Sequence, residues 1–492
     1  MKSFALGMQE RVMRHLNTIV TVLFVQLVVL TAPVFAYTCD KFVSPTGTSG
    51  GDGSSAAPWS LSSAITGAGG RIQGGHTVCL KEGTYPLSNA RLSVSGSSTA
   101  PVIFRNAPNE RPILDANGGN SNLLTVAASN VWLWGLEFTD SSSAPQFFAA
   151  LAVSTGSGVK VINCNFHDMG GAGIGAWAEN TGLELYGSSS FFNGRNISAR
   201  GYGIYTQNAT GSKLYEDNFF FWNFGGYNVH AYGEAGRLNN MTYRGNVSMD
   251  GIMMVGGTSS QAQNLVWERN FNYKTGANPS GSTVYIGYSA GVANAIIRDN
   301  IFPSGNVWWA YANNIQSMTG NLFRGNLHYH NNTPSGVTPA QTTVPHQFPN
   351  NTYLFTPSSG ILPMLTGMKV FVRRNKYEEG RGNIIVYNFD GVSSLSVDLS
   401  SVGLQIGQQF EVRDGQNPFG PSVVSGTYDG ANVNIPLNAL TTATPKSLPS
   451  GSSSDITAIN HSKKEFNFFT ILPGIISTPS NPASPRNLRI TG

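Results

Sequence analysis

A short apolar strand recurs along the middle of this chain, and its spacing limits the possible folds more than any other feature of the sequence. The copies cover residues 174–177, 203–207, 229–232, 253–256, 284–287 and 307–310. Measured from residues 174, 204, 229, 253, 284 and 307, successive copies lie 30, 25, 24, 31 and 23 residues apart. One strand per step of this length is what each coil of a stacked solenoid requires.

A second series of positions, rich in asparagine, keeps step with these strands. Its members precede turns, and they are Asn165, Asn218, Asn246, Asn270, Asn300 and Asn321, with Ser190 filling one rung and Glu137 extending the series backwards. Stacked asparagine side chains satisfy backbone groups in solenoid turns, so we assign them that structural task. Two series in step predict a parallel β-helix, which we place at residues 37–348 with an N-terminal cap.

Composition agrees with an all-β chain. Glycine occurs 57 times and charged residues make up only 11% of the sequence, as expected where many tight turns need positive φ. From residue 352 onward the rhythm changes to short alternating strands separated by turn signals such as those at 390–391 and 429–430. This pattern predicts a small antiparallel β-sandwich over residues 349–474, followed by a flexible Ser/Pro-rich tail at 475–492.

The first 36 residues have the pattern of a secretory signal peptide. Three basic residues precede an apolar run from residue 19 to residue 30, and small residues at 34–36 suit cleavage near Ala36. We therefore expect a secreted chain that begins near Tyr37 and has no membrane segment after cleavage. In an oxidising compartment a Cys39–Cys79 disulfide is expected, with Cys164 left as a buried thiol.

Net charge argues against a nucleic-acid partner. Without residues 1–36 the chain carries 27 basic and 25 acidic residues, with no clustered basic face. No Cys or His spacing resembles a zinc site, and no cofactor is predicted. We expect a monomer.

Several segments resemble a known superfamily. The stretches 42–47, 51–53, 58–59 and 75–85 are similar to the opening of secreted right-handed parallel β-helix proteins of the pectate-lyase-like superfamily. The stretches 167–168, 201–208 and 230–234 resemble a pattern in bacterial β-helix proteins, in which His often stands where this chain has Tyr202. Residues 349–474 resemble the C-terminal sandwich modules of carbohydrate-active enzymes. The resemblance implies cleavage of a polysaccharide, with a lyase slightly favoured over a hydrolase.

Strand periodicity places a candidate groove on one face of the solenoid. If Ile174, Ile204, Val229, Met253, Val284 and Val307 point inward, two outward rows follow. The first row is Gly175, Tyr205, His230, Met254, Tyr285 and Trp308, and the second is Trp177, Gln207, Tyr232, Gly256, Gly287 and Ala310. Aromatic faces stack on sugar rings, so these rows predict a glycan groove. The alternative is that a loop or the C-terminal module covers them.

Within this groove His230 is the expected general acid/base, with Tyr205 and Tyr232 beside it. The predicted substrate-binding residues are Trp177, Gln207, Tyr232, Tyr285, Trp308 and Tyr202. A hydrolase would instead use a carboxylate pair, for which Asp168 and Glu234 are the candidates. A non-catalytic glycan-binding or cell-surface protein would use the same aromatic rows without a catalyst, and a structural protein would leave no open groove.

A lyase needs a base and a cation that neutralises the uronate carboxylate. In the superfamily that the resemblance implies, the base is commonly Lys or Arg, often with Ca²⁺, so Ca²⁺ remains open here. The candidate cations are Lys213, Arg244, Arg269, Lys274 and Arg298, most of them near the asparagine series. Asp217, Asp250 and Asp299 are scattered and form no evident Ca²⁺ cluster, so no metal ligand is predicted.

Overall fold

Three long stacks of short strands make up most of the chain. The computed structural model describes residues 37–196, 200–233, 236–275, 282–310, 314–325, 327–330, 337–339, 345, 347–355, 362–449, 459–462 and 464–474. The predicted signal peptide and tail lie outside these residues. Among the described residues, no helix is long and apolar enough to cross a membrane.

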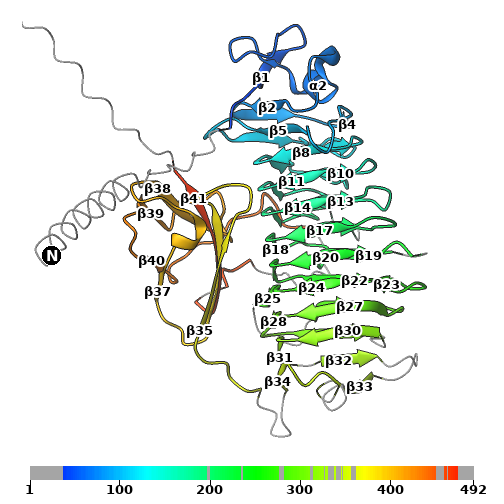
Figure 1. The fold of residues 1–492 in the computed structure, drawn as a ribbon, viewed down its shortest axis with the longest axis vertical. Coiled ribbons are helices and arrows are strands. Elements are labelled where there is room, and N and C mark those ends of the chain that lie inside the picture. The colour runs from blue at the N-terminus through cyan, green and yellow to red at the C-terminus, as the bar shows by residue number, and fades with distance from the viewer. Residues whose placement is uncertain are drawn as a thin grey trace, which may run out of the picture. The chain divides into compact units, whose positions relative to one another are not determined.

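Sheet A, with 12 strands, runs along one side of the solenoid (Figure 1). Its order is β1 (Lys41–Thr48), β2 (Thr77–Leu80), β5 (Val102–Asn106), β8 (Val131–Trp134), β11 (Lys160–Ile162), β14 (Glu184–Tyr186), β17 (Lys213–Glu216), β20 (Met241–Arg244), β24 (Val266–Glu268), β27 (Val292–Arg298) and β23 (Ala262–Gln263), with β30 (Asn314–Thr319) also paired to β27.

Sheets B and C, with 11 strands each, complete the coils. Sheet B contains β3 (Gly83–Pro86), β6 (Pro112–Asp115), β9 (Glu137–Thr139), β12 (Asn165–His167), β15 (Ser189–Phe191), β18 (Phe219–Phe221), β21 (Val247–Met249), β25 (Phe271–Tyr273), β28 (Ile301–Phe302), β31 (Leu322–Arg324) and β34 (Thr352–Leu354). Sheet C contains β4 (Ala90–Leu92), β7 (Leu124–Val126), β10 (Leu151–Val153), β13 (Ile174–Ala176), β16 (Ile204–Thr206), β19 (Tyr227–Tyr232), β22 (Ile252–Gly256), β26 (Ser282–Ile286), β29 (Asn306–Ala310), β32 (Leu327–His330) and β33 (Val337–Pro339).

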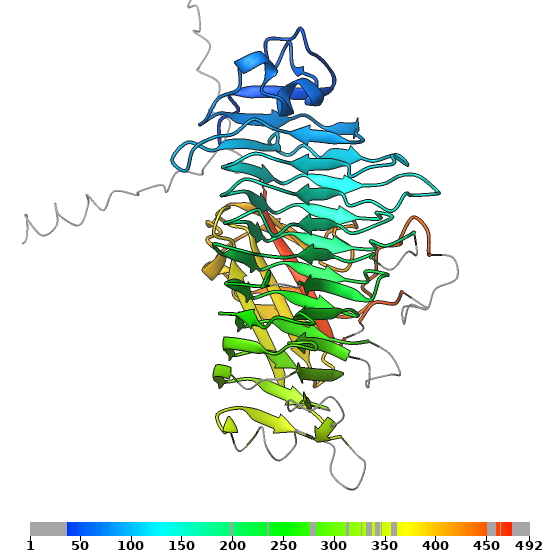
Figure 2. The ribbon, with the colours of Figure 1, turned by 90° about the vertical axis from the view of Figure 1, so that its right-hand side faces the viewer.

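The solenoid confirms the strand register predicted from the repeats. Ile174, Ile204, Val229, Met253, Val284 and Val307 pair in register along sheet C and are all buried. Apart from β33, which pairs antiparallel to β32, neighbouring strands within the three sheets are parallel (Figure 2). Burying one apolar side chain per coil in the same row is what stabilises a stack whose strands are only two to eight residues long.

The N-terminal cap closes one end of the stack. It carries α2 (Leu61–Ile65) and the 3₁₀ turn η1 (Ala68–Gly70), packed around the fully buried Trp59. The predicted Cys39–Cys79 disulfide is present, with the two Cα atoms 5.6 Å apart, and Cys164 is buried and free as predicted.

The asparagine series forms a continuous hydrogen-bonded ladder at the turn between sheets A and B. From Asn218 through Asn246, Asn270, Asn300 and Asn321, each amide nitrogen donates to the next side-chain oxygen and to a backbone carbonyl, and the ladder ends on the side-chain oxygen of Asn351. The prediction was wrong at the start of the series. Asn165, Glu137 and Ser190 lie in the strands themselves, and the rung before Asn218 is Ser188, whose backbone N–H donates to the Asn218 oxygen.

A C-terminal antiparallel region follows the solenoid. Its five-stranded sheet has the order β35 (Met368–Arg374), β36 (Gly382–Asn388), β41 (Phe466–Pro473), β38 (Gln409–Asp414) and β39 (Val424–Thr427). A two-stranded ladder of β37 (Ser394–Val397) and β40 (Val433–Pro436), with the 3₁₀ turn η2 (Ser400–Val402), shares one apolar core with it. The parallel pairing of the solenoid continues to β34, beyond the predicted end at residue 348.

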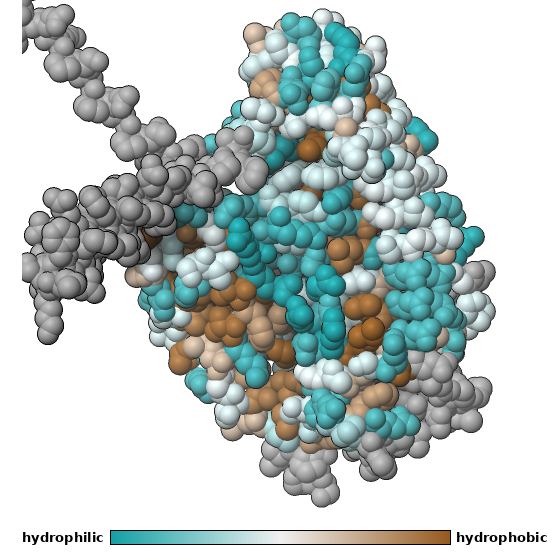
Figure 3. Space-filling model, in the orientation of Figure 1, coloured by the Kyte–Doolittle hydropathy of each residue, from teal (hydrophilic) through white to brown (hydrophobic). Residues whose placement is uncertain are grey.

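The outer faces of sheets B and C differ in what lies on them. The antiparallel region packs on sheet B, where Phe219 and Phe221 share a buried cluster with Phe466 and Phe468. On the face shown in Figure 3, a band of polar residues runs between apolar patches. Sheet C has no such partner among the described residues, and its outer face is hollowed.

Candidate active site

A cavity of about 530 Å³ opens over the outer face of sheet C. Its floor is the outward row of the register, in which Gly175 pairs with Tyr205 and Tyr205 pairs with His230. The lining residues are Asn122, Phe147, Phe148, Ala149, Gly171, Ala172, Gly175, Trp177, Arg200, Tyr202, Tyr205, His230 and Tyr232. We refer to this cavity as the groove.

Five of the residues predicted for the site line the groove together: Trp177, Tyr202, Tyr205, His230 and Tyr232. The loop that carries Phe147 and Phe148 forms a wall rather than a cover, because Phe148 keeps 36% and Trp177 keeps 41% of its surface exposed. The alternative in which a loop buries the aromatic rows therefore does not hold at this point of sheet C.

Tyr205 is fixed by its neighbours in the groove. Its hydroxyl donates to the backbone carbonyl of Tyr232 at 3.1 Å. The Gln207 amide nitrogen donates to the Tyr205 hydroxyl and to the Tyr232 carbonyl, each at 3.0 Å. Gln207 thus supports the site without lining the groove. Tyr285 lies further along the sheet, where its hydroxyl donates to Ser282. Glu234 and the side chain of Trp308 lie outside the described residues.

His230 sits among aromatic rings. Its ring centroid lies 4.4 Å from those of Tyr202 and Tyr227 and 5.5 Å from those of Tyr205 and Tyr232. Its Nδ1 atom is buried with no hydrogen-bond partner among the described residues. Burial lowers the pKa of His230 to about 4. The imidazole is therefore neutral near pH 7 and can accept a proton, but it cannot act as the general acid of the resting protein.

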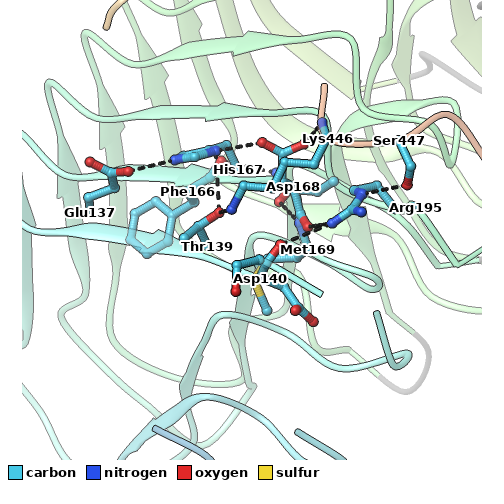
Figure 4. Close-up of polar contacts among 12 residues, drawn as sticks. Glu137, Thr139, Asp140, Phe166, His167, Asp168, Met169, Arg195, Lys446 and Ser447 are labelled. Carbon is cyan, nitrogen blue, oxygen red and sulfur yellow. Dashed lines mark hydrogen bonds and ion pairs between the residues drawn. The ribbon is translucent and has the colours of Figure 1, made fainter. Parts of the chain in front are cut away.

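The structure places Asp168 in the turn that follows β12, outside the residues that line the groove. Its carboxylate accepts hydrogen bonds from the His167 ring at 2.8 Å and from the Lys446 backbone N–H at 2.8 Å (Figure 4). Asp168 occupies a turn with φ of 58°, at the end of β12, and is buried under residues 446–447 of the C-terminal region. It cannot form a catalytic pair in the groove, and the hydrolase arrangement of Asp168 with Glu234 loses one of its members.

His167 forms a buried charged cluster with its neighbours. Its two ring nitrogens lie 3.1 Å from Glu137 and 2.8 Å from Asp168, and the ring stacks on Phe191. Burial opposes protonation, but the hydrogen bonds and charges of the two carboxylates outweigh it and raise the pKa of His167. Burial likewise opposes ionisation of Glu137, while His167 and Arg111 together lower its pKa. This cluster holds the covered face together and is remote from solvent.

Arg200 is the groove residue that the sequence pattern missed. It is exposed and is the only formally charged residue among the described residues that line the groove. Burial raises the pKa of Tyr202 to about 12, and the positive charge of Arg200 opposes this rise. The sequence offered one signal for Arg200, namely its position four residues before the start of β16, the strand that carries Tyr205.

None of the five cations considered from the sequence lines the groove. Arg244 and Arg298 form ion pairs with Glu268 on sheet A. Arg269 directly follows β24 of sheet A, and Lys274 directly follows β25 of sheet B. Lys213 is buried beneath the groove, where its ammonium donates to backbone carbonyls at 2.7 and 3.4 Å, and burial lowers its pKa to about 7. Within the described residues, no group of three or more His, Cys, Asp or Glu side chains could hold a metal ion.

Comparison with known proteins supports the fold. Residues 41–224 match the family model described as "Pel9A-like, right handed beta helix region". A search of curated proteins finds no match. Among solved structures, the chain is similar to pectate lyase Pel9A, with 18% identity, a TM-score of 0.38, and coverage of 62% of this chain and 80% of that one.

Two further structures show the range of the likeness. One is a glycoside hydrolase, with 9% identity, a TM-score of 0.44, and coverage of 64% of this chain and 96% of that one. The other is an alginate lyase from Paenibacillus sp. str. FPU-7, with 15% identity, a TM-score of 0.35, and coverage of 59% of this chain and 95% of that one. At these TM-scores the likenesses do not bear on the activity of this chain. Residues 41–224 are therefore similar to a Pel9A-like right-handed β-helix region, in agreement with the resemblance to the pectate-lyase-like superfamily.

Proposed function

We propose that this protein is an exported polysaccharide lyase that cleaves a uronate-bearing glycan in the groove over sheet C. The observation that carries the proposal is the composition of the groove, which joins aromatic walls, a single cation and a neutral imidazole. No Asp or Glu is among the described residues that line it. Aromatic rings bind sugar faces, and a guanidinium binds a carboxylate with two parallel hydrogen bonds.

The chemistry follows from these groups. In β-elimination a base removes the C5 proton of a uronate, the C4–O bond breaks, and the leaving oxygen takes up a proton. Arg200 would neutralise the carboxylate and so acidify the C5 proton. His230 would take that proton as a neutral base, and a bound uronate anion close to the ring raises its low pKa toward a useful range. Tyr205 is the proposed proton donor to the leaving oxygen: its hydroxyl would turn from the Tyr232 carbonyl to donate, and the proton taken by His230 would then return to the phenolate.

The first experiment compares polymers of opposite chemistry. The chain from Tyr37 onward is incubated with alginate and polygalacturonate, which carry uronates, and with dextran and starch, which do not. Each digest is read for new reducing ends and for the ultraviolet absorbance of an unsaturated uronate. The proposal predicts both signals on a uronate polymer only. Reducing ends without the absorbance would identify a hydrolase, and binding without either signal would identify a glycan-binding protein.

Arg200→Gln tests the carboxylate-binding role on the polymer that is cleaved. Loss of the charge should raise the KM about tenfold, because a charged hydrogen bond to the substrate is lost. Arg269→Gln is the matched control, since Arg269 is an exposed arginine in a turn and does not line the groove. Equal effects of the two substitutions would contradict the assignment. Addition of a chelator tests Ca²⁺ use, and we expect cleavage to persist.

Export rests on the sequence of residues 1–36. Recovery of the protein from the culture medium with Tyr37 at its N-terminus would support this part of the proposal. Retention in the cell with an intact Met1 would contradict it.

A further inference from the structure

A single buried guanidinium joins the segments that form the groove. The Arg195 side chain donates to the backbone carbonyls of Asp140 and Asp168, each at 3.0 Å, and of Ser142 at 2.9 Å. Its Nε atom donates to the hydroxyl of Ser447 at 2.9 Å (Figure 4). Arg195 is 5% exposed, so these four hydrogen bonds are shielded from water.

The three carbonyls precede two segments that line the groove. Asp140 and Ser142 lead into the wall at residues 147–149, and Asp168 leads into the floor at residues 171–172. Arg195 itself precedes the groove residues Arg200 and Tyr202. One side chain therefore fixes the base of the wall and the base of the floor relative to each other and to residue 195.

Neighbouring contacts extend the same arrangement. The Asn196 amide donates to the backbone carbonyl of Pro145 at 3.1 Å, within the wall loop, and its backbone N–H donates to Gly170 at 3.1 Å. The wall and the floor also touch directly, since the Gly171 N–H donates to the Phe148 carbonyl. On the other side, Ser447 belongs to the C-terminal region, beside Lys446, whose ammonium donates to Thr139.

We infer that Arg195 is a positioning residue for the groove, and that Ser447 lets the C-terminal region support the groove from behind. This inference rests on the proposed function for its catalytic consequence, but not for its structural one. Arg195 touches no substrate. It acts by holding Phe148, Ala172 and Arg200 at the separations that a bound glycan requires, and small displacements of such residues weaken binding.

The test compares Arg195→Met with Arg373→Met in the exported protein. Arg373 also joins the C-terminal region to the solenoid, through Asp217, but none of its partners leads into the groove. Amide hydrogen exchange is measured without any glycan. Arg195→Met should accelerate exchange at residues 140–149 and 168–172 about tenfold, because local opening no longer breaks the guanidinium bonds. Arg195→Lys should give a smaller rise, since an ammonium cannot span all four acceptors.

Kinetics on polygalacturonate or alginate, whichever the unaltered protein cleaves, provide the second measurement. Arg195→Met should raise the KM about fivefold with kcat within about twofold, and Ser447→Ala should raise it less. Arg373→Met should leave the KM unchanged. Exchange that rises equally along the whole chain, or equally in Arg373→Met, would overturn the inference. If neither polymer is cleaved, the proposed function fails on that result, while the exchange data still decide the role of Arg195.

Discussion

Two histidines that lie two coils apart in the solenoid have opposite surroundings. His230 lies on the outer face of sheet C, among tyrosine rings, and burial alone lowers its pKa to about 4. His167 lies on the outer face of sheet B, between Glu137 and Asp168, and the two carboxylates raise its pKa although it is more deeply buried than His230. Burial disfavours the protonated form of His230 beside the open groove, whereas two carboxylates favour the protonated form of His167 under the C-terminal region.

The difference shows how one repeating backbone supports two tasks. The strands are alike, so the identity of the outward residues and of what covers them decides the chemistry. Removing a residue from the covered face should therefore affect stability, and removing one from the open face should affect cleavage.

The largest effect is expected from His167→Ala. Two buried carboxylates would lose their shared partner, and breaking a buried charge pair in this way costs about 3–5 kcal/mol of the free energy of unfolding. Urea unfolding measures the loss. His230→Ala serves as the control and should cost much less, because no charged group depends on that ring. Equal destabilisation by both substitutions would contradict the distinction between the faces.

His230→Ala should in turn abolish most of the cleavage. Loss of a general base typically lowers the rate by roughly 100-fold or more. The rate of formation of unsaturated product is the measurement, and circular dichroism checks that the variant is folded. If the rate stays within about threefold of the unaltered protein, His230 is not the base.

The pH dependence of stability should carry opposite signs for the two residues. Burial lowers the pKa of His230 from 6.5 to about 4, so between these pH values the unfolded chain binds a proton at His230 and the folded chain does not. Stability therefore falls as the pH falls through this range. His167 has a raised pKa, so its contribution is complete below pH 6.5 and is lost as pH rises through the folded pKa.

Substitution separates these two slopes. His230→Phe should flatten the stability profile between pH 6.5 and about 4, and His167→Gln should flatten its alkaline side. Thermal unfolding at a series of pH values gives both curves. A steeper acid-side loss in His230→Phe would exclude the neutral imidazole.

The smallest effect is expected at the groove rim. Trp177→Ala should raise the KM about fivefold, because one aromatic stacking contact with the glycan is lost, and should change stability little because Trp177 is 41% exposed.

Phe221→Ala is the counterpart of this substitution on sheet B, where the ring is buried between Phe191 and Phe468. It should lower the free energy of unfolding by about 3–5 kcal/mol without changing the KM. A KM change in Phe221→Ala would show that the two faces are coupled.

Local sequence patterns predicted the solenoid because each coil repeats an inward apolar residue in its strand and a polar residue at its turn. The inward row from Ile174 to Val307 and the asparagine ladder from Asn218 onward follow from period and stacking alone. The start of the ladder was misplaced because Asn165 lies one residue past the rung position, which Cys164 occupies. The triplet Phe219-Phe220-Phe221 could have shown that sheet B is covered, since it is apolar on both faces.

The site was predicted where it depends on strand register and missed where it depends on loops. Tyr205, His230 and Tyr232 were found because alternate residues of paired strands share a face. Arg200 and Phe148 lie in connections between strands, and long-range hydrogen bonds from Arg195 and Asn196 hold the connection that carries Phe148. Asp168 was misassigned for the same reason, because its turn points toward the C-terminal region and no local pattern records that.

The most direct test of the account is a titration of the histidine rings by nuclear magnetic resonance, with the Cε1 positions labelled with carbon-13. His230→Gln and His167→Gln identify the two resonances. The account predicts that the His230 signal titrates near pH 4 and that the His167 signal titrates above pH 6.5. A His230 ring that titrates at or above pH 6.5 would contradict the neutral base in the open groove.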